Sequence, residues 1–222
     1  MELHKRHEKT ILCFDLDGTL ADSTQAYVEA FKLAFDRNNL PPRGSDEIKK
    51  WFGLPALQII KNLYPRISDR KLPTVAKHKT EFFLEKTFKL VKPITGVSEA
   101  IEELKKNYFL AVVSNSSKDE IVSVLRQAGI PPRTFDAAVA ASDVAYGKPD
   151  GDEIFKVQEK LKAKCEYVIG DTTYDVVAGK AAGRKTVAVL SGIHNLEQLG
   201  AENPTIIIKS VALLPDLLFG RL

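Results

Sequence analysis

The stretch Ile11-Leu12-Cys13-Phe14-Asp15-Leu16-Asp17-Gly18-Thr19-Leu20 joins four apolar residues to two closely spaced acids and a glycine. Four consecutive apolar residues are typical of a parallel strand covered by helices on both faces. Carboxylates are costly inside such a sheet, but at the carboxyl end of the strand they reach the crevice in which open α/β folds bind ligands. Because two carboxylates this close repel each other, one must bind a cation or keep its proton.

The pattern downstream of residue 93 alternates short β-rich apolar runs with helical segments, which is the signature of βα units and a parallel sheet. Besides the first strand at 11–14, we predict strands at 109–113, 137–140, 167–169, 186–190 and 205–208. One helix is opened by the capping box Ser117-Lys118-Asp119-Glu120 and terminated by Gly129. The others are predicted at 97–107, 151–161, 175–182 and 211–219. The expected fold class is α/β, with a Rossmann-like parallel sheet flanked by helices.

A long segment separates the first strand from the next strand of the sheet, and its patterns are helical. Residues 24–38 carry apolar side chains at the i, i+3, i+4, i+7 spacing of an amphipathic helix. Pro55 is expected at the first position of a second helix, which ends near residue 63. Pro73 is expected at the first position of a third helix, which ends near residue 88. We therefore predict a Rossmann-like catalytic core and an inserted all-helical cap domain, with the core at 1–20 and 93–222 and the cap at 21–92.

Composition and charge narrow the possible partners and compartments. Two cysteines in 222 residues cannot form a multi-disulfide framework and favour a reducing compartment. Because no stretch approaches the ~20 apolar residues of a membrane span, and the first apolar run is too short for a signal-peptide core, we expect a cytoplasmic protein without a membrane partner. The formal net charge is 32 − 29 = +3. No nucleic-acid-binding motif accompanies the basic residues, so we expect no nucleic-acid partner.

Three other predicted strands are followed by polar residues of complementary kinds. Ser114-Asn115-Ser116 follows the strand at 109–113 at a helix start, and Lys148 comes after the strand at 137–140. Asp171 and Asp175 come after the strand at 167–169. Because carboxyl ends of parallel strands share one edge, we expect these side chains to converge. An acidic cluster with a lysine and a hydroxyl suits Mg²⁺ and a phosphoryl group, whereas zinc prefers nitrogen and sulfur ligands.

The order of the motifs DLDGTLADS, SNS, GKPD and GDTTYD resembles the haloacid dehalogenase superfamily of phosphatases with a helical cap, in particular its phosphoglycolate phosphatase group. The resemblance covers nearly the whole chain. It implies hydrolysis of a small phosphate monoester with Mg²⁺ as cofactor, through an aspartyl-phosphate intermediate. The implied partner is a small phosphorylated metabolite. Phosphoglycolate is the leading candidate, ahead of pyrophosphate, sugar phosphates and nucleotides.

The resemblance also implies catalytic and substrate-binding residues. Asp15 would be the nucleophile, which divides one difficult hydrolysis into two easier steps. Asp17 would be the general acid to the leaving alcohol and then the general base to water. Ser114 and Asn115 would bind the phosphoryl group, and Lys148 would neutralise charge on Asp15 and on the phosphate.

The same resemblance implies a set of metal ligands. Mg²⁺ would be held by the carboxylate of Asp15, the backbone carbonyl of Asp17 and the carboxylate of Asp171. Asp175 would either orient a metal-bound water or orient Lys148. The cation would offset the repulsion between the anionic nucleophile and the anionic phosphate.

Two alternatives stay open beside the phosphatase. Hexose phosphate mutases of the same fold resemble the chain, but they carry a cap arginine after the glycine of the first cap loop and a histidine after the first motif. Here the corresponding stretches read Gly53-Leu54-Pro55-Ala56 and Ala26-Tyr27-Val28. A non-catalytic sensor of a phosphorylated metabolite would have no need of Asp17, and dehalogenases of the superfamily lack an acid at that position. Whether the protein is a monomer or a homodimer is left open.

Overall fold

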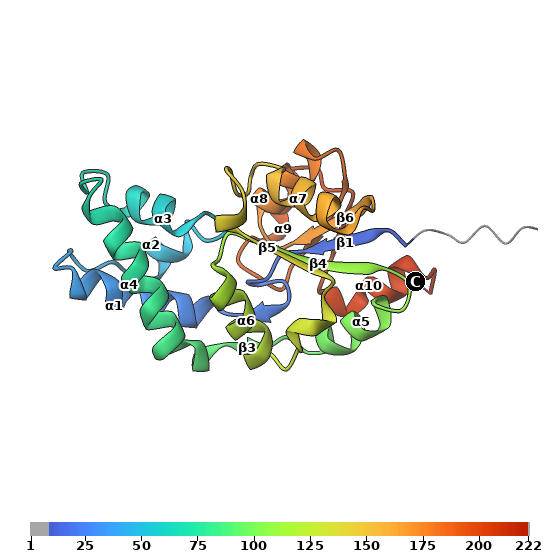
Figure 1. Cartoon of the computed structure of the whole chain (residues 1–222), viewed down its shortest axis with the longest axis horizontal. Coiled ribbons are helices and arrows are strands. Elements are labelled where there is room, and N and C mark those ends of the chain that lie inside the picture. Colours follow the sequence, from blue (N-terminus) through green and yellow to red (C-terminus); the bar gives the residue numbers. More distant parts are fainter. Residues whose placement is uncertain (1–8, 222) are drawn as a thin grey trace, which may run out of the picture.

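Six parallel strands form one sheet in the computed structural model, which describes residues 9–221 (Figure 1). The order β5-β4-β1-β6-β7-β8 places the first strand of the chain near the centre. This is the strand order of a doubly wound Rossmann-like sheet, and the predicted fold class is confirmed. The strands are β1 (Ile11–Phe14), β4 (Phe109–Ser114), β5 (Ala137–Ala140), β6 (Cys165–Gly170), β7 (Lys185–Val189) and β8 (Ile206–Ile208).

Helices cover both faces of this sheet because successive side chains of each strand point to opposite faces. Leu12 and Phe14 of β1 pack in the cluster that includes α5, α6 and α10, whereas Ile11 and Cys13 pack against α7 and α8. All four side chains are fully buried. The helices of the core are α5 (Val97–Leu104), α6 (Lys118–Gln127), α7 (Asp152–Leu161), α8 (Thr173–Ala181), α9 (Leu196–Ala201) and α10 (Leu214–Leu218).

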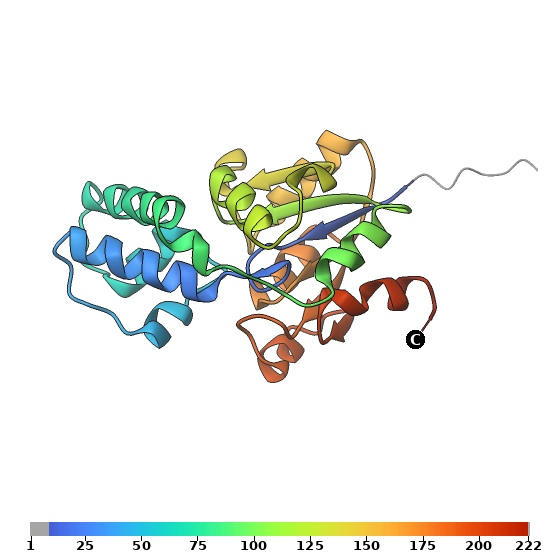
Figure 2. The ribbon, with the colours of Figure 1, turned by 90° about the horizontal axis from the view of Figure 1, so that it is seen from below.

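The segment between β1 and β4 forms a group of helices at one end of the molecule (Figures 1 and 2). Most of its apolar residues form a cluster of their own, centred on side chains such as Phe31, Phe35 and Ile60, while Tyr27 and Phe83 belong to a cluster that covers the sheet. The group therefore has a hydrophobic core apart from the two clusters that cover the sheet. It consists of α1 (Thr24–Arg37), α2 (Ser45–Lys49), α3 (Ala56–Leu63), α4 (Lys71–Glu85) and the 3₁₀ turn Thr87–Leu90.

A short antiparallel ribbon joins this helical group to the sheet. It pairs β2 (Ala21–Asp22) with β3 (Lys92–Pro93), so the chain enters and leaves the group side by side. Two-residue strands carry no periodic pattern, and none was expected here. The division into a core and a cap stays a prediction, of which residues 1–8 and Leu222 lie outside the described residues.

Several helix boundaries differ from the expected ones. Pro73 is the third residue of α4 rather than its first, and Pro55 stands just before α3. A proline is tolerated there because the N–H groups of a first helical turn have no partner within the helix. The helix expected to run to residue 88 ends at Glu85, and a 3₁₀ turn follows. Among residues 9–221, none of the helices has the length and the apolarity that crossing a membrane requires.

Candidate active site

Polar residues that follow three strands of the sheet line one cavity, and Lys148, which follows a fourth strand, is buried behind them against Asp15. The cavity has a volume of about 650 Å³, counted together with the space that opens to solvent, and it lies between the carboxyl edge of the sheet and the helical group. The sheet side of its lining includes Asp15, Asp17, Ser114, Asn115 and Asp171. The helical group contributes apolar and aromatic side chains and one lysine, among them Tyr27, Phe31, Phe52, Ile59 and Lys79.

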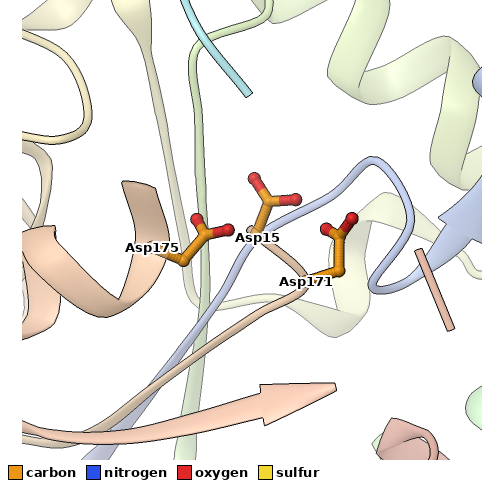
Figure 3. Close-up of side chains that lie close together, drawn as sticks. All are labelled: Asp15, Asp171 and Asp175. Atoms are coloured by element: carbon orange, nitrogen blue, oxygen red, sulfur yellow. The ribbon is translucent and has the colours of Figure 1, made fainter. Parts of the chain in front are cut away.

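Three buried carboxyl groups lie together at the centre of this edge. Asp15, Asp171 and Asp175 each offer an oxygen atom within 4.8 Å of the others, and Figure 3 shows the three groups side by side. Burial raises the pKa of Asp171 to about 7 and the pKa of Asp15 well above its usual range, and the charge of Asp175 adds to both effects. A divalent cation relieves such repulsion, and carboxylate oxygens are the ligands that Mg²⁺ prefers. The donor set therefore fits Mg²⁺.

The position of Asp171 is set by hydrogen bonds and by a glycine. Its Oδ1 accepts a hydrogen bond from Thr19 Oγ1 at 3.1 Å, and its Oδ2 accepts one from the backbone N–H of Ile193 at 2.8 Å. Gly18 has a φ of +87°, and a Cβ atom there would lie 2.5 Å from Asp171 Oδ2. Only glycine allows both this turn and this close approach, so the motif around Asp15 and the carboxylate of Asp171 fit together.

Lys148 lies buried against the carboxyl groups. Its ammonium group donates to Asp15 Oδ1, to Asp175 Oδ1 at 2.7 Å and to the backbone carbonyl of Val113 at 3.1 Å. Burial alone would lower its pKa, but the carboxylates of Asp15 and Asp175 raise the pKa of Lys148 well above its usual value. Lys148 is therefore a fixed positive charge beside Asp15.

Asp175 is held at both of its oxygens. One oxygen accepts the hydrogen bond from Lys148, and the other accepts from Thr172 Oγ1 at 2.6 Å and from the Thr172 backbone N–H at 3.0 Å. The capping box of Thr172 and Asp175 opens α8 and so starts that helix two residues earlier than expected. Of the two roles left open for Asp175, the contact that orients Lys148 is present; a contact with a metal-bound water stays a prediction.

Asp17 lies on the cavity wall, outside the group of three carboxylates. Its Oδ1 accepts a hydrogen bond from Ser23 Oγ at 2.6 Å, and its Oδ2 accepts one from Ser116 Oγ at 3.0 Å. Burial raises the pKa of Asp17 to about 6, although both hydroxyl donors oppose the rise. A carboxyl group with this pKa exchanges a proton readily near neutral pH, as a general acid and base must.

The two residues predicted to bind the phosphoryl group differ in their surroundings. Ser114 ends β4, lines the cavity, and accepts a hydrogen bond from the backbone N–H of Ser116 at 3.1 Å. Asn115 instead donates from its amide nitrogen to the carbonyl of Gly53 at 2.7 Å and to the carbonyl of Lys148 at 3.0 Å. Asn115 thus bridges the helical group and the Lys148 loop, and its role in substrate binding stays a prediction.

Sequence reasoning missed an ion pair that crosses from the helical group to the core. Lys79 Nζ lies 2.7 Å from Glu120 Oε1, and both side chains are almost fully buried. A signal was present in the sequence, because Lys79 stands in the same i, i+4 row of α4 as the buried Val75 and Phe83. A lysine within an apolar row needs a buried partner.

Two further residues near the site were also missed. Tyr27 falls within the amphipathic helix predicted at 24–38, and its hydroxyl contacts Ser116 Oγ at 3.0 Å. Glu153 of α7 is fully buried beside the loop of Lys148, and neither of its carboxylate oxygens has a hydrogen-bond partner among the described residues. Burial raises the pKa of Glu153 to about 7, against the opposing charge of Lys148. A signal of the same kind was present, because Glu153 stands four residues before the buried Val157 of α7.

The chain is similar in sequence and in fold to several known proteins. The model of the haloacid dehalogenase-like hydrolase family matches residues 12–189. Pyrophosphatase PpaX of Halalkalibacterium halodurans is 29% identical over 214 residues, which are 95% of this chain and 96% of that protein. "Probable phosphatase IndB" of Dickeya dadantii is 30% identical over 210 residues, 91% of this chain and 90% of that protein. A haloacid dehalogenase-like hydrolase from Bacteroides fragilis superposes with a TM-score of 0.86 at 25% identity, covering 93% of this chain and 100% of that structure.

Proposed function

The chain belongs to the haloacid dehalogenase-like hydrolase family and is a phosphatase of that family, and we propose that it hydrolyses a small phosphate compound with Mg²⁺ through an aspartyl-phosphate intermediate. One observation carries the proposal. Asp15, at the end of the central strand, lies between the carboxyl groups of Asp171 and Asp175 and accepts a hydrogen bond from the buried Lys148. An anionic nucleophile beside a metal-binding carboxylate and a fixed cation suits attack on an anionic phosphate.

The first chemical step forms a bond between a carboxylate oxygen of Asp15 and phosphorus. The bond from phosphorus to the leaving oxygen breaks, and Asp17 gives its proton to that oxygen. Lys148 stays beside Asp15 and stabilises negative charge on the transferring group. When bound by Asp15, Asp171 and the backbone carbonyl of Asp17, Mg²⁺ would supply Lewis-acid stabilisation of that charge.

The second step returns the enzyme to its starting state. Asp17, now ionised, accepts a proton from water, and the water oxygen attacks the phosphorus of the aspartyl-phosphate. The bond from phosphorus to Asp15 breaks, and inorganic phosphate is released. A pKa of about 6 for Asp17 supports both halves of this cycle, because the group is able to give and take a proton near neutral pH.

Two substrates lead the proposal. Phosphoglycolate follows from the motif resemblance, and pyrophosphate follows from the likeness to a protein named pyrophosphatase PpaX. The cavity supports a small substrate, because its volume is about 650 Å³ even with the space that opens to solvent included. The proposed partner is therefore a small phosphorylated metabolite, and a cytoplasmic location stays a prediction.

The test is phosphate release from a panel of phosphorylated metabolites that includes phosphoglycolate and pyrophosphate, with Mg²⁺ and with a chelator. We expect metal-dependent release, and we expect Asp15→Asn to reduce kcat by at least about 10³-fold while the thermal unfolding midpoint changes little. Substantial activity of Asp15→Asn would contradict the covalent mechanism. Interconversion of glucose phosphate isomers without net release would identify a mutase, and binding without turnover would identify a sensor.

A further inference from the structure

A chain of hydroxyl groups connects the helical group to Asp17. Tyr27 of α1 places its hydroxyl 3.0 Å from Ser116 Oγ, and Ser116 Oγ donates to Asp17 Oδ2 at 3.0 Å. Ser116 lies between β4 and α6, in the part of the chain that builds the sheet edge. The general acid of the proposed reaction is thus two hydrogen bonds away from a side chain of the helical group.

The direction of these hydrogen bonds follows from the chemistry of the groups. Oδ2 of Asp17 accepts hydrogen bonds and donates none when the carboxyl group is ionised, and also when the proton that it delivers lies on Oδ1. Ser116 therefore gives its single hydroxyl proton to Asp17, and Tyr27 must donate to the remaining lone pairs of Ser116 Oγ. Without the Tyr27 hydroxyl, the hydroxyl of Ser116 is freer to turn away from Asp17. The carboxyl group would then keep Ser23 as its only side-chain donor among the described residues.

The position of the Tyr27 hydroxyl is fixed by the helical group. Its ring stacks on Phe83 of α4, with centroids 4.4 Å apart and planes inclined by 15°. Lys79 Nζ lies 4.7 Å from the centre of the same ring, and this ammonium group is paired with Glu120 of the core. Tyr27 is buried as a result. Its hydroxyl reaches Ser116 because α1 and α4 are docked on α6 in this arrangement.

We propose that Tyr27 is a positioning residue that acts through Ser116 to aim the Asp17 carboxyl group at the leaving oxygen. This inference rests on the proposed function. In the step concerned, the electron pair of the breaking phosphorus–oxygen bond goes to the leaving oxygen, which takes the proton of Asp17 as Asp15 bonds to phosphorus. Proton delivery therefore depends on a docked helical group, whereas the attack by Asp15 does not use Tyr27.

The test compares two substrates of similar size that differ in their need for a proton. Ethyl phosphate releases an alkoxide that must be protonated, whereas acetyl phosphate releases acetate, which leaves as a stable anion. In Tyr27→Phe, which keeps the ring and removes the hydroxyl, we expect kcat/KM to fall about tenfold for ethyl phosphate and to change less than about twofold for acetyl phosphate, because kcat/KM reports formation of the aspartyl-phosphate and not its hydrolysis. Equal losses on the two substrates would overturn the inference. Failure of the wild type to release phosphate from either one would count against the proposed function instead.

Two further variants sharpen this test. Tyr64→Phe is the matched control, because Tyr64 is a buried tyrosine of the helical group whose hydroxyl donates to the carbonyl of Pro41 within the same group. It should leave the ratio of the two kcat/KM values unchanged. In Ser116→Ala, adding Tyr27→Phe should cause no further loss on ethyl phosphate, because the chain is already broken. Independent, multiplying losses would show that Tyr27 does not act through Ser116.

Discussion

The sheet edge and its junction with the helical group, where Lys79 meets Glu120, differ in how their buried charges are balanced. At the sheet edge, Asp15, Asp171 and Asp175 crowd three buried carboxyl groups against a single lysine. At the junction, Lys79 and Glu120 form one matched pair. Burial raises the pKa of Asp171, whereas Lys79 overcomes burial and holds the pKa of Glu120 below its usual value. The sheet edge is therefore left needing a cation, and the junction is electrostatically complete.

The two regions also differ in what holds their side chains in place. Residues at the sheet edge are placed by the backbone, since each follows a strand whose register is fixed by its neighbours. Residues at the junction are placed by side-chain packing and by single hydrogen bonds. The proposed chemistry accordingly uses residues of the sheet edge, and the helical group supplies side chains that line the cavity and orient groups within it.

The largest effect is expected from Asp171→Asn, which removes one carboxylate from the sheet edge. We expect at least about a 10³-fold loss of kcat/KM and loss of the rise in unfolding midpoint that Mg²⁺ causes in the wild type. The metal-free variant should nevertheless unfold at a higher temperature than the metal-free wild type at pH 8. A midpoint for the metal-free variant below that of the metal-free wild type at pH 8 would contradict the inference that the ionised Asp171 carboxylate destabilises the folded protein.

The sign of that stability change follows from the pKa of Asp171. Its folded pKa of about 7 lies above the ordinary 3.8, so the folded protein binds this proton more tightly than the unfolded chain does. The stability from this proton is fully present below about pH 4 and is lost as the pH rises through 7. Asparagine carries no ionisable proton, so the variant does not undergo this loss of stability at pH 8.

A smaller effect is expected from Lys79→Met, which leaves Glu120 buried without its cation. Breaking one side of a buried pair costs about 3–5 kcal/mol, and we expect the free energy of unfolding in urea to fall by about 3 kcal/mol at pH 8. Lys79→Met/Glu120→Gln should recover most of this loss. The control is Lys77→Met, an exposed lysine of the same helix, which should change stability little. A Lys79→Met variant as stable as the wild type would show that the junction does not depend on this pair.

The smallest effect is expected from Glu153→Gln, a substitution in α7 beside the loop of Lys148. The pKa of Glu153 is about 7 against an ordinary 4.5, so its contribution to stability is present below pH 4.5 and lost as the pH rises through 7. Glutamine cannot ionise, so the variant should gain about 1–3 kcal/mol in free energy of unfolding at pH 8 and little at pH 5. Glu153 Oε1 and Asn115 Oδ1 both lie beside Gly147, and Asn115 Oδ1 has no hydrogen-bond partner among residues 9–221.

The matched control for that measurement is Glu159→Gln on the same helix, where the side chain is exposed. It should show no gain at either pH. An equal gain at pH 5 and pH 8 for Glu153→Gln would mean that packing, rather than loss of a buried charge, explains the change.

The sheet could be predicted closely because its four inner strands, β4, β1, β6 and β7, are buried on both faces. The strands expected at 11–14 and 137–140 have those bounds in the structure, and the other four differ by one or two residues at their ends. The helical group was predicted less well. The five-residue α2 was missed because only Ile48 in it is buried, which leaves no amphipathic period to detect.

The sequence by itself determined which residues stand at the carboxyl ends of the strands, because hydrophobic runs and capping boxes are local and the topology of a parallel sheet brings those ends together. It could not determine how side chains from distant segments pair. Lys79 and Glu120 are 41 positions apart, and Tyr27 meets Ser116 across 89. Such contacts depend on how one packed unit docks on another, and no periodicity along the chain records that. The tertiary structure alone therefore decided which hydroxyl orients Asp17, which carboxylate receives Lys79 and where Glu153 is buried.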